Sequence, residues 1–209
     1  MKPLLITCTL YRFLHNKHIR HKNIRPGNIL ISDREVFISG FGLSPDWSDS
    51  DSDDPEGRPN ALTRRYSAPE VIKGESRGFE SDIWSLGCVY LEMWTMLRGG
   101  SMADLDAHLG EDGSYSSTDF DLEAWITIVD ATPSQSSDSS SSDTPLTWIR
   151  SMLHHNPTQR PTARVIHSMI QKASTSPRAG DMFIGHCCIS EDAESESTTS
   201  SDGDEHQDD

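Results

Sequence analysis

The stretch His21-Lys22-Asn23-Ile24-Arg25-Pro26-Gly27-Asn28-Ile29-Leu30 decides the fold of this chain. Two further short motifs follow it along the sequence, first Gly40-Phe41-Gly42 and then Ala68-Pro69-Glu70. Each motif is short, so the inference about the fold rests on the order and spacing of all three.

The three motifs together resemble the signature of a protein kinase domain, in which a catalytic loop H-R-D-L-x-x-x-N leads to D-F-G and then to A-P-E. The chain keeps this order and changes both acids. Asn23 stands at the position of the catalytic Asp, and Gly40 stands at the position of the magnesium-binding Asp. Asn28 matches the remaining magnesium ligand, and Arg25 replaces the lysine of the loop.

The resemblance extends beyond the three motifs and covers roughly residues 4 to 188. Ser81–Gly87 resembles the start of the long buried helix of the kinase C-lobe. The closing Phe183–Cys188 is similar to an F-C-G-x-C-C ending found in a group of fungal kinase-domain proteins. Thr63 and Tyr66 match the segment that precedes A-P-E.

Several structural roles are implied by this resemblance alone. It implies that Arg160 pairs with Glu70, and a planar guanidinium suits a carboxylate bidentately. It places His21 in a hydrophobic spine with Phe41, and it places Leu30 beneath the adenine of a nucleotide. Asp82 is expected to accept hydrogen bonds from the catalytic-loop backbone, because buried carboxylates usually satisfy backbone donors.

Hydrophobic periodicity predicts a mainly helical, α+β chain. Helices are expected over residues 3–16 and 81–95, around 122–129, and after Thr144 and Pro161, where apolar residues recur at helical spacing. On the last helix, Val165, Ile166, Met169 and Ile170 are expected to share a face. Two short apolar runs, 28–32 and 36–39, predict a small β-hairpin beside the catalytic loop.

The predicted fold is therefore a protein-kinase-like C-lobe without its N-lobe. The chain begins too late to contain the Gly-rich phosphate loop, the strand lysine or the helix glutamate that the resemblance implies. We expect a truncated kinase-like domain over residues 1–175 and an acidic, Ser-rich, disordered tail over 176–209. Inserts at about 46–58 and 134–143 are also expected to be disordered, since they hold too few apolar residues to offset the entropy of ordering.

Composition limits the partners and the compartment. The 209 residues carry a net charge of −15, which disfavours nucleic acid and anionic membrane surfaces and favours a protein partner or substrate. No apolar run approaches the roughly 20 residues that span a bilayer. The 4 cysteines follow neither a metal-ligand spacing nor a disulfide framework, so we expect reduced thiols in the cytoplasm or nucleus. A zinc site at His15, His18 and His21 is an alternative, but no fourth ligand is placed.

The changed acids bear directly on activity. An amide at Asn23 cannot accept the proton of a substrate hydroxyl, and loss of a positioned base costs about 10²- to 10⁴-fold. Without an acid at Gly40, magnesium would rest on Asn28 and on nucleotide phosphates. We therefore expect no cofactor, with ATP and Mg²⁺ relevant only if activity remains.

Three hypotheses about function follow. The preferred one is a catalytically inactive pseudokinase that acts by binding protein. The second is an ATP-dependent Ser/Thr protein kinase with an altered loop, and the third is a gene remnant without a selected function. Phosphorylation of Ser48, Ser50 and Ser52 by an acid-directed kinase is a further hypothesis, because each serine is followed by acids.

Overall fold

The computed structural model describes residues 3–32, 35–41, 61–75, 77–131 and 144–174, and the side chains within them except at 3–6, 61–63, 144 and 174. The expectations for the inserts at 46–58 and 134–143, for the tail from 176, for Phe183–Cys188 and for the three serines at 48, 50 and 52 lie outside the described residues.

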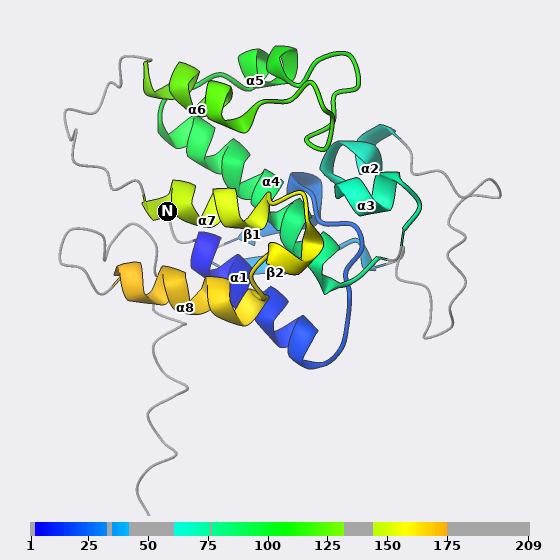
Figure 1. Cartoon of the computed structure of the whole chain (residues 1–209). Coiled ribbons are helices and arrows are strands. Elements are labelled where there is room, and N and C mark those ends of the chain that lie inside the picture. The colour runs from blue at the N-terminus through cyan, green and yellow to red at the C-terminus, as the bar shows by residue number, and fades with distance from the viewer. Residues whose placement is uncertain (1–2, 33–34, 42–60, 76, 132–143, 175–209) are drawn as a thin grey trace, which may run out of the picture.

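The described elements are mostly helices joined by short connections (Figure 1). In chain order they are α1 (Pro3–Asn16), the 3-10 turn η1 (Pro26–Asn28), β1 (Ile29–Ser32), β2 (Glu35–Ile38), α2 (Ala61–Tyr66), α3 (Pro69–Ile72), α4 (Phe79–Leu97), α5 (Met102–His108), α6 (Leu122–Asp130), α7 (Thr144–Met152), the 3-10 turn η3 (Pro157–Gln159) and α8 (Ala163–Ser174).

Helix α4 is the central element of the core. It is buried on almost every side, because apolar residues occupy nearly all of its positions from Ile83 to Trp94. Helix α7 packs closely against it at Gly87, where an added Cβ would fall 2.9 Å from Met152 Cβ. The long central helix thus contacts α2, α5, α7 and η3 and holds them in one core.

Helix α1 packs against α8 and against β2 (Figure 1). The strands β1 and β2 form an antiparallel hairpin in which Ile29 pairs with Ile38 and Ser32 pairs with Glu35. Ile29 and Ile38 pack on the core, whereas Leu30, Ile31 and Phe37 are 51%, 60% and 49% exposed. Val36, next to the turn, is buried as well, so the hairpin packs Ile29, Val36 and Ile38 inward and leaves the cross-strand neighbours Leu30 and Phe37, with Ile31, exposed.

The structure confirms the helices predicted over 3–16 and 81–95, those predicted around 122–129 and after Thr144, and the hairpin. The predicted common face of α8 was wrong in one residue, because Ile166 and Ile170 are fully buried while Val165 is 46% exposed. Phe13, one of the apolar residues at helical spacing on α1, is 58% exposed. A periodic pattern predicts which side of a helix is apolar, but it does not predict how much of that side the neighbouring helices bury.

The short helices α2, α3 and α5 were not predicted from the sequence. Within the described part of the chain, every helix is too short or too polar to cross a bilayer.

Candidate functional site

The residues that match the catalytic loop, His21–Asn28, are called the catalytic-loop segment, and one carboxylate attaches this segment to the start of α4. Asp82, which is 2% exposed, accepts hydrogen bonds from the backbone N–H groups of His21 (2.8 Å to Oδ2) and Lys22 (2.9 Å to Oδ1). The His15 ring nitrogen Nε2 lies 3.3 Å from the same Oδ2 atom. Lys22 has a φ of 64°, and the two bonds to Asp82 fix this uncommon backbone conformation. The expected contact between Asp82 and the loop backbone is present.

His21 is a fully buried residue of the packed interior. Its ring lies 4.7 Å from the Phe41 ring and 6.0 Å from the Tyr11 ring, centroid to centroid. Nε2 lies 2.9 Å from the Ser39 carbonyl oxygen, and Nδ1 accepts a hydrogen bond of 3.2 Å from the Asn23 N–H. One donating and one accepting nitrogen define a neutral imidazole protonated at Nε2. Burial lowers the pKa of His21, against the opposing effects of the Asp82 charge and the Ser39 carbonyl.

Asn23, Asn28 and Gly40 lie together at the base of the hairpin. The Asn28 amide donates from Nδ2 to the Asn23 carbonyl oxygen at 2.8 Å, and the Asn28 carbonyl accepts from Ser39 N at 2.9 Å. Gly40 has a φ of 87°, and an added Cβ would lie 2.5 Å from Asn28 Nδ2 and 2.9 Å from Asn28 Oδ1. The Asn28 side chain thus fills the space next to position 40.

These residues do not fit a magnesium ion. Magnesium prefers oxygen ligands and at least one carboxylate, but Gly40 offers no side chain and Asn28 directs its nitrogen toward a carbonyl. Among the described residues, no three His, Cys, Asp or Glu side chains are grouped so that they could hold a metal ion. His15 and His21 are engaged with Asp82 and Ser39, and the zinc alternative gains no support from these contacts.

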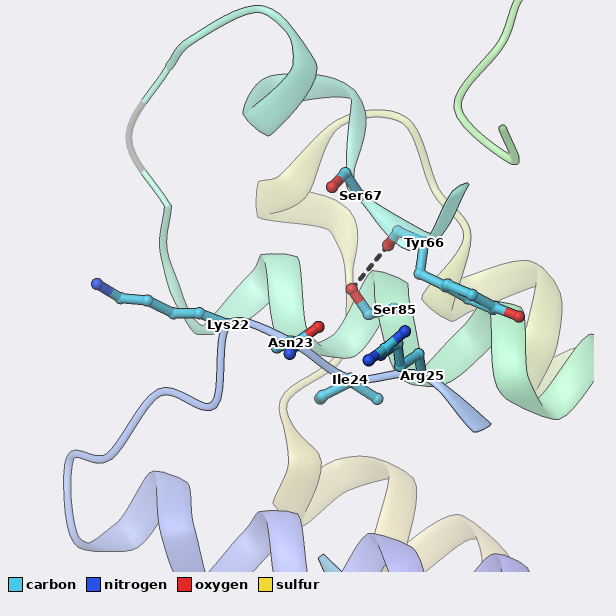
Figure 2. Close-up of a pocket in the computed structure, with 7 residues that line it drawn as sticks. All are labelled: Lys22, Asn23, Ile24, Arg25, Tyr66, Ser67 and Ser85. Atoms are coloured by element: carbon cyan, nitrogen blue, oxygen red, sulfur yellow. Dashed lines mark hydrogen bonds between the residues drawn. The ribbon is translucent and has the colours of Figure 1, made fainter. Parts of the chain in front are cut away.

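A small open pocket lies between the catalytic-loop segment and the end of α2 (Figure 2). It is lined by Lys22, Asn23, Ile24, Arg25, Tyr66, Ser67 and Ser85. Ser85 Oγ donates a hydrogen bond of 2.8 Å to the Tyr66 carbonyl oxygen and so ties α4 to the far wall. In Figure 2 the Lys22 side chain points away from the other lining residues, while the Arg25 guanidinium is turned toward them. Arg25 Nε is buried and has no hydrogen-bond partner within the described residues.

A buried ion pair joins α3 to the turn before α8. Arg160 donates from its two terminal nitrogens to Glu70 at 2.6 Å and 2.8 Å, so the pair is bidentate. The remaining donors of the guanidinium reach the backbone carbonyls of His154, Glu80 and His155. The guanidinium also lies 5.0 Å from the Trp84 ring centroid. The pairing implied by the resemblance is therefore present, with every charge in it compensated.

Sequence reasoning missed a second buried polar cluster. Glu92, on α4, is 8% exposed and accepts hydrogen bonds from the hydroxyls of Tyr66 (2.9 Å) and Tyr115 (2.7 Å). Arg65 Nη2 lies 3.4 Å from Glu92 and 2.5 Å from Asp106. Burial, followed by the Glu92 charge, raises the pKa values of both tyrosines, so both hydroxyls remain donors. A glutamate between Leu91 and Met93 inside an apolar helix was the available signal for such a cluster.

The other predicted site residues are placed as follows. Leu30 lies on β1 with its side chain half exposed. Phe41 stacks at an angle on His21. Thr63 falls within α2, at a position whose side chain is outside the described part of the structure. The structure therefore brings together His21, Asn23, Asn28, Gly40, Phe41 and Asp82, and it leaves Leu30 and the Glu70–Arg160 pair in separate places.

Comparison with known proteins gives the same family as the motifs. The profile of the protein kinase domain family matches residues 6–172. The MAP kinase kinase kinase wis4 of Schizosaccharomyces pombe is 41% identical over 93 residues, which are 40% of this chain and 7% of that protein. Mitogen-activated protein kinase kinase 2 of Arabidopsis thaliana is 42% identical over 84 residues, 39% of this chain and 22% of that protein.

The Serine/threonine-protein kinase Nek10 of Mus musculus is 34% identical over 97 residues, 46% of this chain and 8% of that protein. In each of these three comparisons, the match covers less than a quarter of the length of the relative. The family match, by contrast, takes in most of the chain, from α1 to α8. The chain belongs to the protein kinase domain family, and its similarity to kinases that include a Serine/threonine-protein kinase supports a domain of the Ser/Thr type.

Proposed function

We propose that this chain is a catalytically inactive kinase-like domain that acts by binding a protein partner. The observation that carries the proposal is the arrangement of Asn23, Asn28 and Gly40. Phosphoryl transfer needs a group that accepts the hydroxyl proton and carboxylates that hold Mg²⁺ against the nucleotide phosphates. Asn23 supplies an amide, Gly40 supplies nothing, and the Asn28 side chain is held by the Asn23 carbonyl.

The framework around this site supports a binding role. Asp82 fixes the loop backbone, and the buried Arg160–Glu70 pair fixes the segment on the other side of the pocket. A surface built on such fixed elements can present a constant shape to a partner. We include in the proposal a location in the cytoplasm or nucleus, in keeping with Cys8 and Cys88, which are buried free thiols.

An assay of phosphotransfer tests the proposal. The full chain is incubated with labelled ATP, with Mg²⁺ or Mn²⁺, and with a mixture of basic protein substrates. We expect no transfer above that of an Arg25→Ala, Asn28→Ala double variant prepared in parallel. Transfer by the unmodified chain that is absent from the double variant would overturn the proposal.

The second candidate is an ATP-dependent Ser/Thr protein kinase that retains weak activity. It is favoured by the kinases to which the chain is similar and by the intact anchoring of the catalytic-loop segment through Asp82. The Asn23→Asp, Gly40→Asp double variant tests it, because both acids are then restored. Strong activity in this variant would show that only the acids had been lost. A folded variant without activity would count against this candidate.

The Gly40→Asp change has a structural requirement of its own. A side chain at position 40 displaces Asn28, since the Cβ would lie 2.5 Å from Asn28 Nδ2. Folding of the double variant is therefore checked by circular dichroism before its activity is interpreted. A remnant without a selected function, the third hypothesis, predicts neither transfer nor any specific partner.

A further inference from the structure

We infer that the acidic segment that follows α8, residues 181–209, binds electrostatically to a basic face formed by α1 and α8. The basic face is defined by Arg12 of α1, by Lys17, which directly follows α1, and by Arg164 and Lys172 of α8. The inference goes beyond the proposed function, because it concerns these two helices and not the catalytic-loop segment.

The charges of this chain are segregated along the sequence. The first acid is Asp33, and no acid occurs between Asp143 and Asp181, so α1, α7 and α8 contain none. Residues 181–209, by contrast, carry ten Asp or Glu and neither Lys nor Arg. The net charge of −15 therefore combines basic helices with an acidic segment, and opposite charges of this kind attract each other.

The fold brings the acid-free helices together (Figure 1). Helix α8 packs against α1 and also contacts α7. The Cys8 thiol donates a hydrogen bond of 3.5 Å to the Ala163 carbonyl oxygen, so the middle of α1 lies at the start of α8. Cations from both ends of the described sequence thus meet on helices that carry no carboxylate of their own.

The cations of the basic face are accessible. Ile166 is buried on the inner side of α8, whereas Arg164 and Lys172 are exposed. These two cations are eight residues apart on one side of the helix, about 12 Å along its axis. In the described part of the chain, none of the ion pairs includes Arg12, Lys17 or Arg164. Their charges are therefore available to an acidic ligand.

The acidic segment is close enough along the chain to reach this face. Residues 175–180 separate it from the end of α8 and span at most about 20 Å. Helix α8 has 12 residues and is about 18 Å long, so the segment reaches back along α8 and on to α1. Each exposed charge pair is weak by itself, but a tether of this length gives the segment an effective concentration on the order of mM at the face. This advantage favours the chain's own segment over an acidic partner protein.

The experiment measures paramagnetic broadening of amide signals in the ¹⁵N-labelled full chain. A nitroxide is attached at Ser201→Cys in a chain that also carries Cys187→Ser and Cys188→Ser, because the fully buried Cys8 and Cys88 are protected from the reagent. We expect broadening of the amides of α1 and α8, and none at the acidic helices α5 and α6. In about 1 M salt, where the screening length falls to about 3 Å, the broadening should disappear.

Charge reversal tests whether the basic face is the binding surface. The Lys17→Glu, Arg164→Glu double variant should reduce the relaxation enhancement at α8 about 10-fold, since two attractions become repulsions. The matched control is the Arg64→Glu, Lys73→Glu double variant. It changes the net charge by the same amount at exposed positions on α2 and after α3, and it should leave the broadening unchanged.

A second variant keeps the test decisive if the reversed face does not fold. Glu191→Gln, Asp192→Asn, Glu194→Gln and Glu196→Gln together remove four charges from the acidic segment without any substitution in α1 to α8, and they should also reduce the broadening. Unchanged broadening in this variant, or equal effects of the two charge reversals, would overturn the inference. Equal broadening of a ¹⁵N-labelled chain by a separate spin-labelled chain would also overturn it, because the contact would then join two molecules.

Discussion

The Asn28 side chain occupies the space that a side chain at Gly40 would need, with Nδ2 only 2.5 Å from the position of an added Cβ. Asn28 directly precedes β1 and Gly40 follows the end of β2, and the Asn28 carbonyl oxygen accepts a hydrogen bond from the N–H of Ser39 beside Gly40. The absence of a side chain at position 40 therefore leaves room for the Asn28 amide in its present position. An acid placed at position 40 must move Asn28 before it can approach any ligand.

A Gly40→Ala variant tests this relationship. Gly40 has a φ of 87°, a conformation that costs an L-residue about 1–2 kcal/mol. The added methyl group also displaces Asn28 and weakens its 2.8 Å hydrogen bond to the Asn23 carbonyl, at about 1 kcal/mol. We expect the free energy of unfolding in urea to fall by about 2–3 kcal/mol. Gly74→Ala is the control, because it has a similar φ of 75° and no neighbouring atom within 4 Å of an added Cβ.

The control separates backbone strain from displacement of Asn28. If Gly40→Ala and Gly74→Ala lose the same stability, then the contact with Asn28 has no energetic consequence.

The buried Arg160–Glu70 pair gives a second prediction, and the surface pair Arg150–Glu123 gives its control. Both are bidentate, but the side chains of the first are 0% and 6% exposed and those of the second are 42% and 62% exposed. Glu70→Gln leaves a buried guanidinium without its counter-charge, and we expect a loss of about 3–5 kcal/mol. Glu123→Gln should cost about 0.2–1 kcal/mol, because solvent screens that pair.

Urea denaturation of the two glutamine variants, beside the unmodified chain, provides the comparison. Equal losses would mean that the backbone carbonyls of His154, Glu80 and His155 are sufficient for Arg160.

The contacts made by Asp82, Glu70 and Arg160 were predictable from the resemblance to the kinase motifs. These side chains are buried, and a buried polar group needs a partner. The long helices were predictable for a different reason, since their apolar residues recur at helical spacing. The start of α5 is also marked in the sequence, because a serine is a favoured N-cap residue and the Ser101 hydroxyl accepts a hydrogen bond from Asp104 N.

Other features could not be derived from sequence in the same way. The Glu92 cluster joins α2, α4 and the loop at Tyr115, and no local pattern reports contacts between such distant residues. The exposure of Val165 and Phe13 depends on how far neighbouring elements reach across a helix face. The contact of Asn28 with position 40 required coordinates, because it depends on a side-chain conformation.

A third prediction concerns Asp82 and the rigidity of the loop. Asp82→Asn keeps the shape of the side chain but replaces one accepting oxygen by an NH₂ group, so one of the bonds from His21 N and Lys22 N is lost. We expect faster amide hydrogen exchange at His21 and Lys22 and a loss of about 1.5–3 kcal/mol in stability, typical of a hydrogen bond to a charged group. Unchanged exchange at both amides would show that other contacts hold the loop.

The last prediction is a dependence of stability on pH that arises from His21. Burial lowers its pKa in the folded state below the unfolded value of about 6.5. The unfolded chain then binds more protons, so the stabilisation is fully present above about pH 6.5 and is lost as the pH falls toward the folded pKa. Protonation at Nδ1 also places a hydrogen against the Asn23 N–H, which now donates to that nitrogen.

The measurement is the difference in unfolding free energy between the unmodified chain and a His21→Phe variant, from pH 7.5 to pH 5. His155, whose pKa burial also lowers, is present in both proteins, so its contribution cancels in the difference. We expect the advantage of the unmodified chain to shrink below about pH 6.5, by at most about 1.4 kcal/mol per pH unit for one proton. Two parallel profiles would mean that His21 does not titrate in this range and that the loop at Asn23 is insensitive to acid.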